Sequence, residues 1–261
     1  MKRVTLTMTG GIAHVALSRP DKMNAVDMPM LEAVLEMGGS LAQTEGLRAV
    51  VISGEGKAFC AGLDVASFAM LAAGDPEALI MPRSHGAANR FQQFALVWRS
   101  LPVPVIAAVH GACYGAGFQL ALGADLRISA PDARFAVMEM KWGLIPDMGG
   151  MVLLPELTRG DVIRRLTYTA EPIEAPQAER WGLVTEIADD PLARAVEIAQ
   201  TIAQKSPSAI RAAKRLIDVA LTADRAAVLH AESREQTDLV GKPDQMAVIA
   251  ANLGGRAPVF G

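Results

Sequence analysis

Residues 103–150 read VPVIAAVHGACYGAGFQLALGADLRISAPDARFAVMEMKWGLIPDMGG, and the rest of the chain is best understood around them. The apolar run that ends at Val109 predicts a buried strand. A glycine-rich turn at 114–117 leads directly into an apolar segment at 118–122 that predicts a helix. The free N–H groups and the positive dipole end of such a helix face the turn. This turn therefore suits a developing negative charge.

Three polar residues follow the turn within the same stretch. Gln119 lies in the predicted helix, and Glu139 ends a second strand-like run at 133–138. Asp147 follows in the segment IPDMGG, residues 145–150. One segment thus supplies a candidate anion-stabilising turn, an amide and two carboxylates.

Composition limits the classes of function that fit the chain. It has 261 residues, of which 51% are hydrophobic, so it can bury a sizeable core. A net charge of −3 and only 5% aromatic residues argue against nucleic acid or an anionic membrane as the main partner. No apolar run has the length of a membrane span, and no export signal is recognised, so we expect a cytoplasmic protein. Cys60 and Cys113 form neither a disulfide framework nor a metal-binding pattern.

The segments before residue 103 alternate between strand and helix patterns. Short alternating runs at 4–8 and 13–18 predict a hairpin. Helical spacing from Met28 to about Ala42 predicts a helix, with Asp27 as its N-cap. The apolar run 49–53 predicts a buried strand. Residues 66–99 are predicted to be helical, with breaks near 74–76 and 81–82.

The segments after residue 150 are mostly helical. A short strand is expected at 183–187, and periodic apolar residues predict helices at 151–158, 161–169, 173–182, 191–204, 208–222, 224–239 and 245–253. Alternating strands and helices followed by a helical block predict an α/β core with an appended helical lobe.

Two glycine clusters suggest phosphate binding, but neither has the required spacing. The loop 54–58 lacks the Ser or Thr that holds magnesium in a phosphate-binding loop, because Ala58 occupies that position. The turn 111–117 lacks the G-x-G-x-x-G spacing of a dinucleotide site. From composition and spacing alone, the chain is an α/β domain of enzyme-like character.

Five segments, in collinear order, resemble one known family. KAFCAGLD at 57–64 resembles the family segment KAFxAGxD, and residues 104–127 resemble PxIAAVxGxAxGGGxxLAxxxDxR. Residues 20–25 are similar to the RPxxxNA loop, 179–184 to A-x-x-x-G-L-V, and 256–261 to R-x-P-x-F-x-G. The chain is therefore identified as a member of the crotonase family, the enoyl-CoA hydratase/isomerase superfamily.

This resemblance implies a fold, an assembly and a class of substrate. The expected fold is a crotonase-like spiral of ββα repeats with a C-terminal helical trimerisation lobe. We expect residues 1–190 to form the core that binds acyl-CoA and residues 191–261 to form the lobe. Trimers of the family usually pair into hexamers. The implied substrate is an acyl-CoA thioester, so coenzyme A is part of the substrate and not a separate cofactor. The resemblance implies no redox cofactor and no metal.

The resemblance also assigns candidate site residues. The thioester oxygen would lie between the backbone N–H groups of Leu63 and Ala116, where preorganised donors stabilise an enolate. The candidate coenzyme A residues lie in two short segments that the family motifs cover. They are Met23, Ala25, Ala61, Gly62, Leu63 and Asp64.

The sequence departs from the hydratase pattern at two positions. Typical hydratases carry two glutamates; the second is present as Glu139, but the first position is Gln119, which can orient water but cannot exchange its proton. Asp147 occupies a position where plain hydratases usually have a small residue. Dienoyl-CoA isomerases and 4-chlorobenzoyl-CoA dehalogenases have an aspartate there. The isomerases also have the equivalent of Glu139 and usually a third carboxylate at the position of Gln119, whereas the dehalogenases lack the glutamate and use the aspartate as nucleophile.

Three functions are therefore compared. The favoured hypothesis is an isomerase that moves a double bond in an unsaturated acyl-CoA, with Glu139 and Asp147 as proton carriers. The second is a hydratase or related lyase that works with a single glutamate. The third, from another class, is a catalytically silent CoA-binding or scaffold protein.

Overall fold

The computed structural model describes residues 2–67 and 74–260, and its architecture is α/β as predicted. A six-stranded sheet has the order β1-β2-β3-β4-β6-β9, in which only the β1–β2 pair is antiparallel. A three-stranded sheet has the order β5-β7-β8. The strands are β1 (Val4–Thr9), β2 (Ile12–Leu17), β3 (Ala49–Gly54), β4 (Val105–Val109), β5 (Ala112–Tyr114), β6 (Leu126–Ser129), β7 (Arg134–Ala136), β8 (Ile173–Glu174) and β9 (Glu186–Ile187).

The predictions for the N-terminal quarter are confirmed. The hairpin β1–β2 turns at Gly10 and Gly11, both of which have positive φ. Helix α1 (Met28–Ala42) starts as expected, because the Asp27 carboxylate accepts a hydrogen bond from Met30 N at 2.9 Å.

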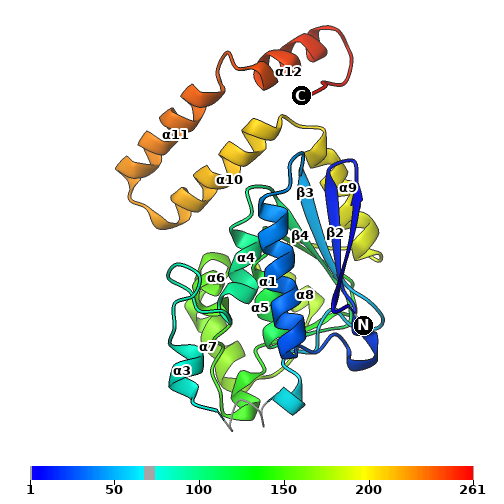
Figure 1. The fold of residues 1–261 in the computed structure, drawn as a ribbon, viewed down its shortest axis with the longest axis vertical. Coiled ribbons are helices and arrows are strands. Elements are labelled where there is room, and N and C mark those ends of the chain that lie inside the picture. Colours follow the sequence, from blue (N-terminus) through cyan, green and yellow to red (C-terminus); the bar gives the residue numbers. More distant parts are fainter. Residues whose placement is uncertain (1, 68–73, 261) are drawn as a thin grey trace.

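Helices cover both faces of the large sheet (Figure 1). On one face, Val50 and Ile52 of β3 belong to the main core, together with side chains of α1, of α4 (Gln93–Arg99) and of α5 (Ala116–Leu122). On the other face, Ala49 and Val51 pack with residues of α9 (Pro191–Ala203). Both faces of this central strand are thus buried, which explains its continuous apolar run.

The prediction for residues 66–99 is partly wrong. Helix α3 (Pro76–Ile80) and helix α4 are present, but the chain between Met81 and α4 is not helical. There Asn89 Oδ1 accepts a hydrogen bond from Gln92 N at 2.8 Å, and Asn89 Nδ2 donates to Ile80 O at 2.8 Å. These backbone groups therefore pair with a side chain and not with the backbone groups that a helix would supply. The part of the predicted helix at 68–73 lies outside the described residues.

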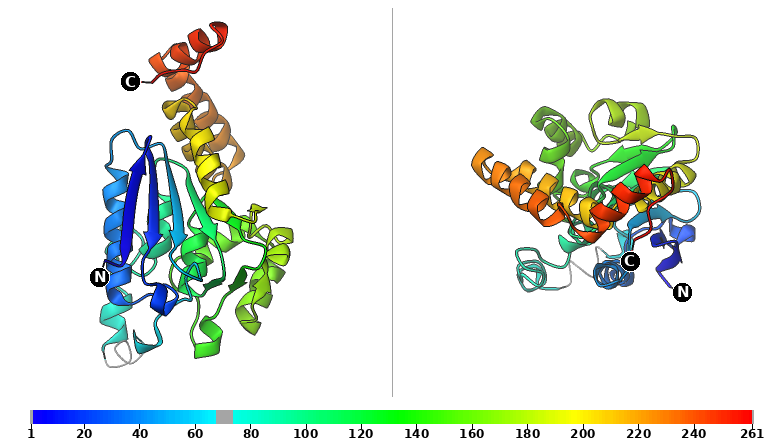
Figure 2. Two further views of the ribbon diagram at one scale, coloured as in Figure 1. Left: turned by 90° about the vertical axis from the view of Figure 1, so that its right-hand side faces the viewer. Right: turned by 90° about the horizontal axis from the view of Figure 1, so that it is seen from above.

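The helices after residue 150 follow the prediction closely, although residues 173–174 form β8 instead of a helical turn. The helices are α6 (Gly150–Leu157), α7 (Gly160–Thr169), α8 (Ala175–Arg180), α10 (Pro207–Thr222), α11 (Arg225–Leu239) and α12 (Pro243–Leu253). The predicted boundary at residue 190 falls before α9, which packs on the sheet of its own chain. The helices that extend away from the core are α10–α12, as Figures 1 and 2 show.

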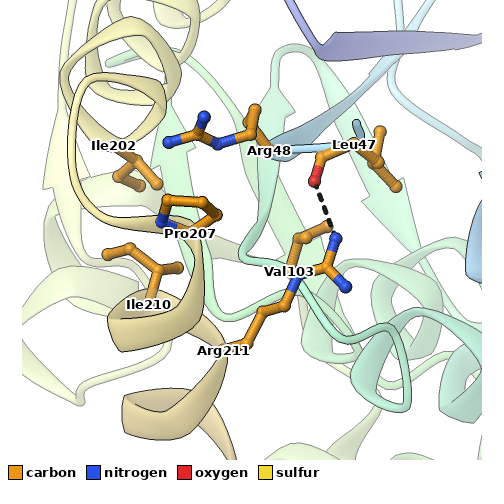
Figure 3. Close-up of a pocket in the computed structure, with 7 residues that line it drawn as sticks. All are labelled: Leu47, Arg48, Val103, Ile202, Pro207, Ile210 and Arg211. Atoms are coloured by element: carbon orange, nitrogen blue, oxygen red, sulfur yellow. Dashed lines mark hydrogen bonds between the residues drawn. The ribbon is translucent and has the colours of Figure 1, made fainter. Parts of the chain in front are cut away.

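Helix α10 is attached to the core at its N-terminal half. Figure 3 shows Arg211 reaching from α10 to Leu47 O, a hydrogen bond of 3.2 Å. One turn later, the buried Lys214 ammonium bonds Val103 O at 2.9 Å and the Asp125 carboxylate at 2.8 Å. Beyond this anchor the extension carries exposed apolar side chains, among them Ile217, Leu229, Met246 and Leu253. Within the described residues, no helix combines the length and apolar character needed to cross a membrane.

Candidate active site

Two chain segments far apart in sequence run side by side at the carboxyl end of β4. The segment after β3 pairs with the segment after β4 through Cys60 N to Ala112 O at 3.0 Å and Tyr114 N to Cys60 O at 2.9 Å. Gly111 makes this approach possible, because a Cβ atom added there would lie 2.2 Å from Lys57 O. The glycine-rich turn predicted from the sequence therefore lies where two backbone segments are in direct contact.

The N–H groups of Leu63 and Ala116 emerge from these two segments. Leu63 pairs with Val26 in a parallel bridge whose hydrogen bonds use its neighbours Gly62 and Asp64, so the Leu63 N–H points away from Val26. Ala116 is the first residue of α5, where N–H groups have no helical acceptor. In the described chain, neither N–H donates a backbone hydrogen bond.

Gly62 brings the two N–H groups close together. A Cβ atom added to Gly62 would lie 2.9 Å from Tyr114 O and 3.8 Å from Ala116 N. Its φ of 96° is also one that side chains disfavour. Two N–H groups without a backbone acceptor in the described chain thus lie on adjacent turns, and such a pair of donors can stabilise a negatively charged oxygen.

Glu139 lies beside this pair of turns. It follows β7 and begins the 3₁₀ helix η2 (Glu139–Trp142). A Cβ atom added to Gly115 would lie 3.5 Å from Glu139 Oε1, so the carboxyl group adjoins the turn that presents Ala116. Its Oε2 atom is buried and has no hydrogen-bond partner among the described residues. Burial raises the pKa of Glu139, and the nearby Asp147 charge raises this pKa further.

Gln119 is only 2% exposed and connects Glu139 to the loop that carries Asp147. Its Nε2 atom donates to Glu139 Oε1 at 2.6 Å. Its Oε1 atom accepts hydrogen bonds from Met148 N and Gly150 N, each at 2.9 Å. The amide is thus engaged at both ends by protein groups.

Asp147 lies directly before Met148 in that loop. Its residue surface is exposed in the single chain, yet desolvation by the surrounding protein raises the pKa of its carboxyl group. Because its charge also acts on Glu139, the two carboxyl groups are electrostatic neighbours. The structure therefore brings Gln119, Glu139 and Asp147 close together.

Asn24 joins the two segments that contain the predicted coenzyme A residues. It is fully buried, and its Nδ2 atom donates to Glu55 O, Ala58 O and Phe59 O at 2.9, 2.9 and 3.2 Å. The neighbouring Met23 O accepts from Ala61 N at 2.9 Å. The sequence indicated no role for Asn24. The available signal was an asparagine in a loop, a residue type that tolerates the positive φ of 55° found here.

Asp64 is engaged by its own chain. Its carboxylate pairs with Arg19 at 2.6 Å and accepts a hydrogen bond from Ala66 N at 3.0 Å. These hydrogen bonds lower the pKa of Asp64. The Arg19 guanidinium also bonds Ala25 O at 2.9 Å, so Arg19 and Asp64 hold the loops beside Leu63 in place. Lys22 is the exposed basic side chain of the same loop.

Possible metal ligands and reactive thiols were sought in the described part of the chain. No group of three or more His, Cys, Asp or Glu side chains there could hold a metal ion. Cys60 and Cys113 are buried free thiols, and burial raises the pKa of Cys60 to about 12. A thiol with so high a pKa is a poor nucleophile.

Comparison with known proteins shows the family of the chain. Residues 7–260 match the family model described as enoyl-CoA hydratase/isomerase. The human mitochondrial Delta(3,5)-Delta(2,4)-dienoyl-CoA isomerase is 36% identical over 210 residues, which cover 78% of this chain and 64% of that relative. A probable enoyl-CoA hydratase 2 of Arabidopsis thaliana is 31% identical over 96% of this chain and 81% of its own. A carnitinyl-CoA dehydratase of Salmonella enteritidis is 36% identical over 81% of this chain and 78% of its own.

Solved structures give the same result for the fold. The enoyl-CoA hydratase of Bacillus anthracis superposes with a TM-score of 0.89 at 28% identity, over 99% of this chain and 98% of the other. The chain is an α/β protein with the crotonase fold, as predicted. The chain belongs to the enoyl-CoA hydratase/isomerase family. Its match spans slightly under two thirds of the length of the dienoyl-CoA isomerases, at 64%.

Proposed function

We propose that this protein is an acyl-CoA enzyme that moves a double bond in an enoyl- or dienoyl-CoA. The observation that carries the proposal is the engagement of Gln119 by Glu139, Met148 and Gly150. The amide oxygen already accepts two hydrogen bonds and one of the two amide N–H groups is committed to Glu139, so at most one N–H is left for a water molecule, with which the amide cannot exchange a proton. Glu139 and Asp147 are then the two groups that can move protons, and the raised pKa of each favours reversible protonation.

In the proposed mechanism the thioester oxygen accepts hydrogen bonds from Leu63 N and Ala116 N. Glu139 removes a proton from the saturated carbon next to the thioester carbonyl, and the electron pair of the broken C–H bond delocalises to give an enolate. Loss of one such donor costs about 10²–10³ in rate in other enzymes, so we expect this to be a large catalytic contribution. Asp147, protonated at the start, delivers a proton at the other end of the conjugated system, so the product has the same mass as the substrate. Loss of the proton from Glu139 and reprotonation of Asp147 then restore the starting state. We propose that no cofactor is needed, because only protons move.

One specific observation favours hydration as the second candidate. Glu139 Oε2 has no hydrogen-bond partner in the described chain, so this oxygen keeps an unused capacity to accept a hydrogen bond. The names of the hydratase and dehydratase relatives are consistent with this alternative.

A panel of 2-enoyl-, 3-enoyl- and dienoyl-CoA esters separates the two reactions. Products are followed by mass and by ultraviolet absorbance, because hydration adds the mass of water and isomerisation changes only the conjugation. We expect isomerised products of unchanged mass. Hydration of a 2-enoyl-CoA at ordinary enzyme rates, without isomerisation, would contradict the proposal.

The non-catalytic alternative is tested by the same panel, because turnover of any ester excludes it. Coenzyme A esters should also raise the melting temperature, since a ligand at 100 times its Kd adds about 2.7 kcal/mol to the stability of the native state. A trimer or dimer of trimers and a cytoplasmic location stay predictions; the human isomerase relative is named as mitochondrial.

A further inference from the structure

The orientation of the Gln119 amide is determined by its neighbours. Met148 N and Gly150 N are both donors and lie 2.9 Å from the same atom, which must therefore be the amide oxygen. The amide nitrogen is then directed at Glu139 Oε1, 2.6 Å away. Two backbone groups thus decide which end of Gln119 meets the carboxyl group.

This orientation makes the two oxygen atoms of Glu139 unequal. An amide N–H can only donate, so Glu139 Oε1 acts as an acceptor in this contact. A proton on Glu139 consequently resides on Oε2, which is buried and has no partner among the described residues. We propose that Gln119 is a positioning residue that holds Oε1 of Glu139 as a hydrogen-bond acceptor and so confines the carboxyl proton of Glu139 to Oε2.

The same amide also holds the second carboxylate. Met148 follows Asp147, and Gly150 begins α6, whose N-terminus has no side-chain cap from its own loop. A Cβ atom added to Gly150 would lie 2.7 Å from Gln119 Cγ, so glycine permits the close approach. Gln119 therefore fixes the loop of Asp147 and the carboxyl group of Glu139 relative to each other.

A glutamate at position 119 could accept the two backbone N–H groups equally well. Its second oxygen would then meet Glu139 Oε1 at about the present 2.6 Å, and two carboxylates at that separation must share a proton. Glutamine occupies the same space without competing for the proton of Glu139. The effect of this arrangement on catalysis rests on the proposed isomerase function. The arrangement itself can be tested without measuring turnover.

The test is the titration of Glu139 by carbon NMR of protein labelled at the glutamate carboxyl carbon. The resonance is assigned by its loss in Glu139→Gln. Gln119→Met removes the donor that favours ionised Glu139, so the midpoint of Glu139 should rise by about one pH unit. Gln119→Glu, which has the same size, should raise it further. The control Gln43→Glu adds the same charge at the exposed end of α1 and should leave the midpoint unchanged.

The outcomes distinguish this proposal from the proposed function. An identical Glu139 midpoint in the wild type and both Gln119 variants overturns the positioning role, even if the wild type isomerises its substrate. If the titration midpoint of Glu139 shifts in the Gln119 variants but the wild type isomerises no ester, the proposed function is wrong and the positioning role of Gln119 is retained. In turnover, Gln119→Met should lower kcat at least about tenfold with little change in KM and move the pH–rate curve with the Glu139 midpoint. If Gln119→Met does not fold, Gln119→Glu alone carries the test.

Discussion

Cys60 and Cys113 are register partners in a parallel β-bridge, and each lies three residues before one of the two candidate oxyanion donors. Both are fully buried, so the two turns start from one rigid contact. Gly117 completes that contact, since a Cβ atom added there would lie 2.5 Å from Cys60 O. The distance between the Leu63 and Ala116 N–H groups is therefore a property of this backbone pairing.

Comparing Gly62→Ala with Gly46→Ala should distinguish an effect on catalytic activity from an effect on stability. Both glycines have positive φ, so each substitution should cost about 1–2 kcal/mol of stability from backbone strain, and the close contact at Gly62 adds to this cost. Only at Gly62 does the new methyl group approach Tyr114 O and Ala116 N; at Gly46 nothing lies within 4 Å. We expect Gly62→Ala to lose about 10²–10³ in kcat and Gly46→Ala to keep its activity. Equal activity in the two variants would exclude the proposed oxyanion hole.

Glu139→Gln should abolish most of the turnover while the fold is retained. The amide can accept the hydrogen bond from Gln119 but cannot carry a proton. We expect kcat to fall at least about a hundredfold in steady-state assays, with an unchanged circular dichroism spectrum. Turnover within a few fold of the wild type would show that another group removes the proton.

The same variant should change how stability depends on pH. The folded chain raises the pKa of Glu139 above 4.5, so it binds this proton more tightly than the unfolded chain does. The wild type therefore loses stability as pH rises from 4.5 through the raised folded pKa, and Glu139→Gln does not. Thermal unfolding should find the variant at least as stable as the wild type at pH 8, with the difference shrinking toward pH 4.5. A variant that melts lower at pH 8 would argue against this desolvation.

Asp147→Asn distinguishes the two reactions. If both carboxylates move protons, isomerisation should fall at least about a hundredfold, with Asp132→Asn on the surface as a control of unchanged activity. In a hydratase with a single glutamate the substitution would be nearly silent. The rates of isomerisation and hydration should be measured for both variants with the same esters.

The exposed apolar side chains of α10–α12 predict that copies of this chain associate. Ile217 is 58% and Leu253 is 87% exposed in the single chain, and large exposed apolar patches mark surfaces that bind other proteins. Light scattering at micromolar concentration should give a trimer or hexamer of the 27.6 kDa chain. Ile217→Asp should weaken the assembly, whereas Thr222→Asp on the same helix should not. A stable wild-type monomer would contradict this expectation.

Much of the fold could be predicted because its signals are local. Asp27 and the apolar spacing after it determine where α1 begins, and alternation with a glycine turn determines the hairpin β1–β2. The motifs around Leu63 and Ala116 identified the two turns for the same reason. The chain between Met81 and α4 was mispredicted, because there the Asn89 side chain replaces helical backbone bonds.

The sequence by itself determined the family pattern, most helices and strands, and the presence of two carboxylates near a glycine-rich turn. Only the tertiary structure decided that α9 packs on its own sheet, because an amphipathic helix has the same pattern whichever surface covers it. Only the tertiary structure decided the contacts of Gln119, whose partners Glu139, Met148 and Gly150 lie 20 to 31 positions away. Hydrogen bonds over such separations depend on how the strands and turns assemble, and no local pattern encodes them.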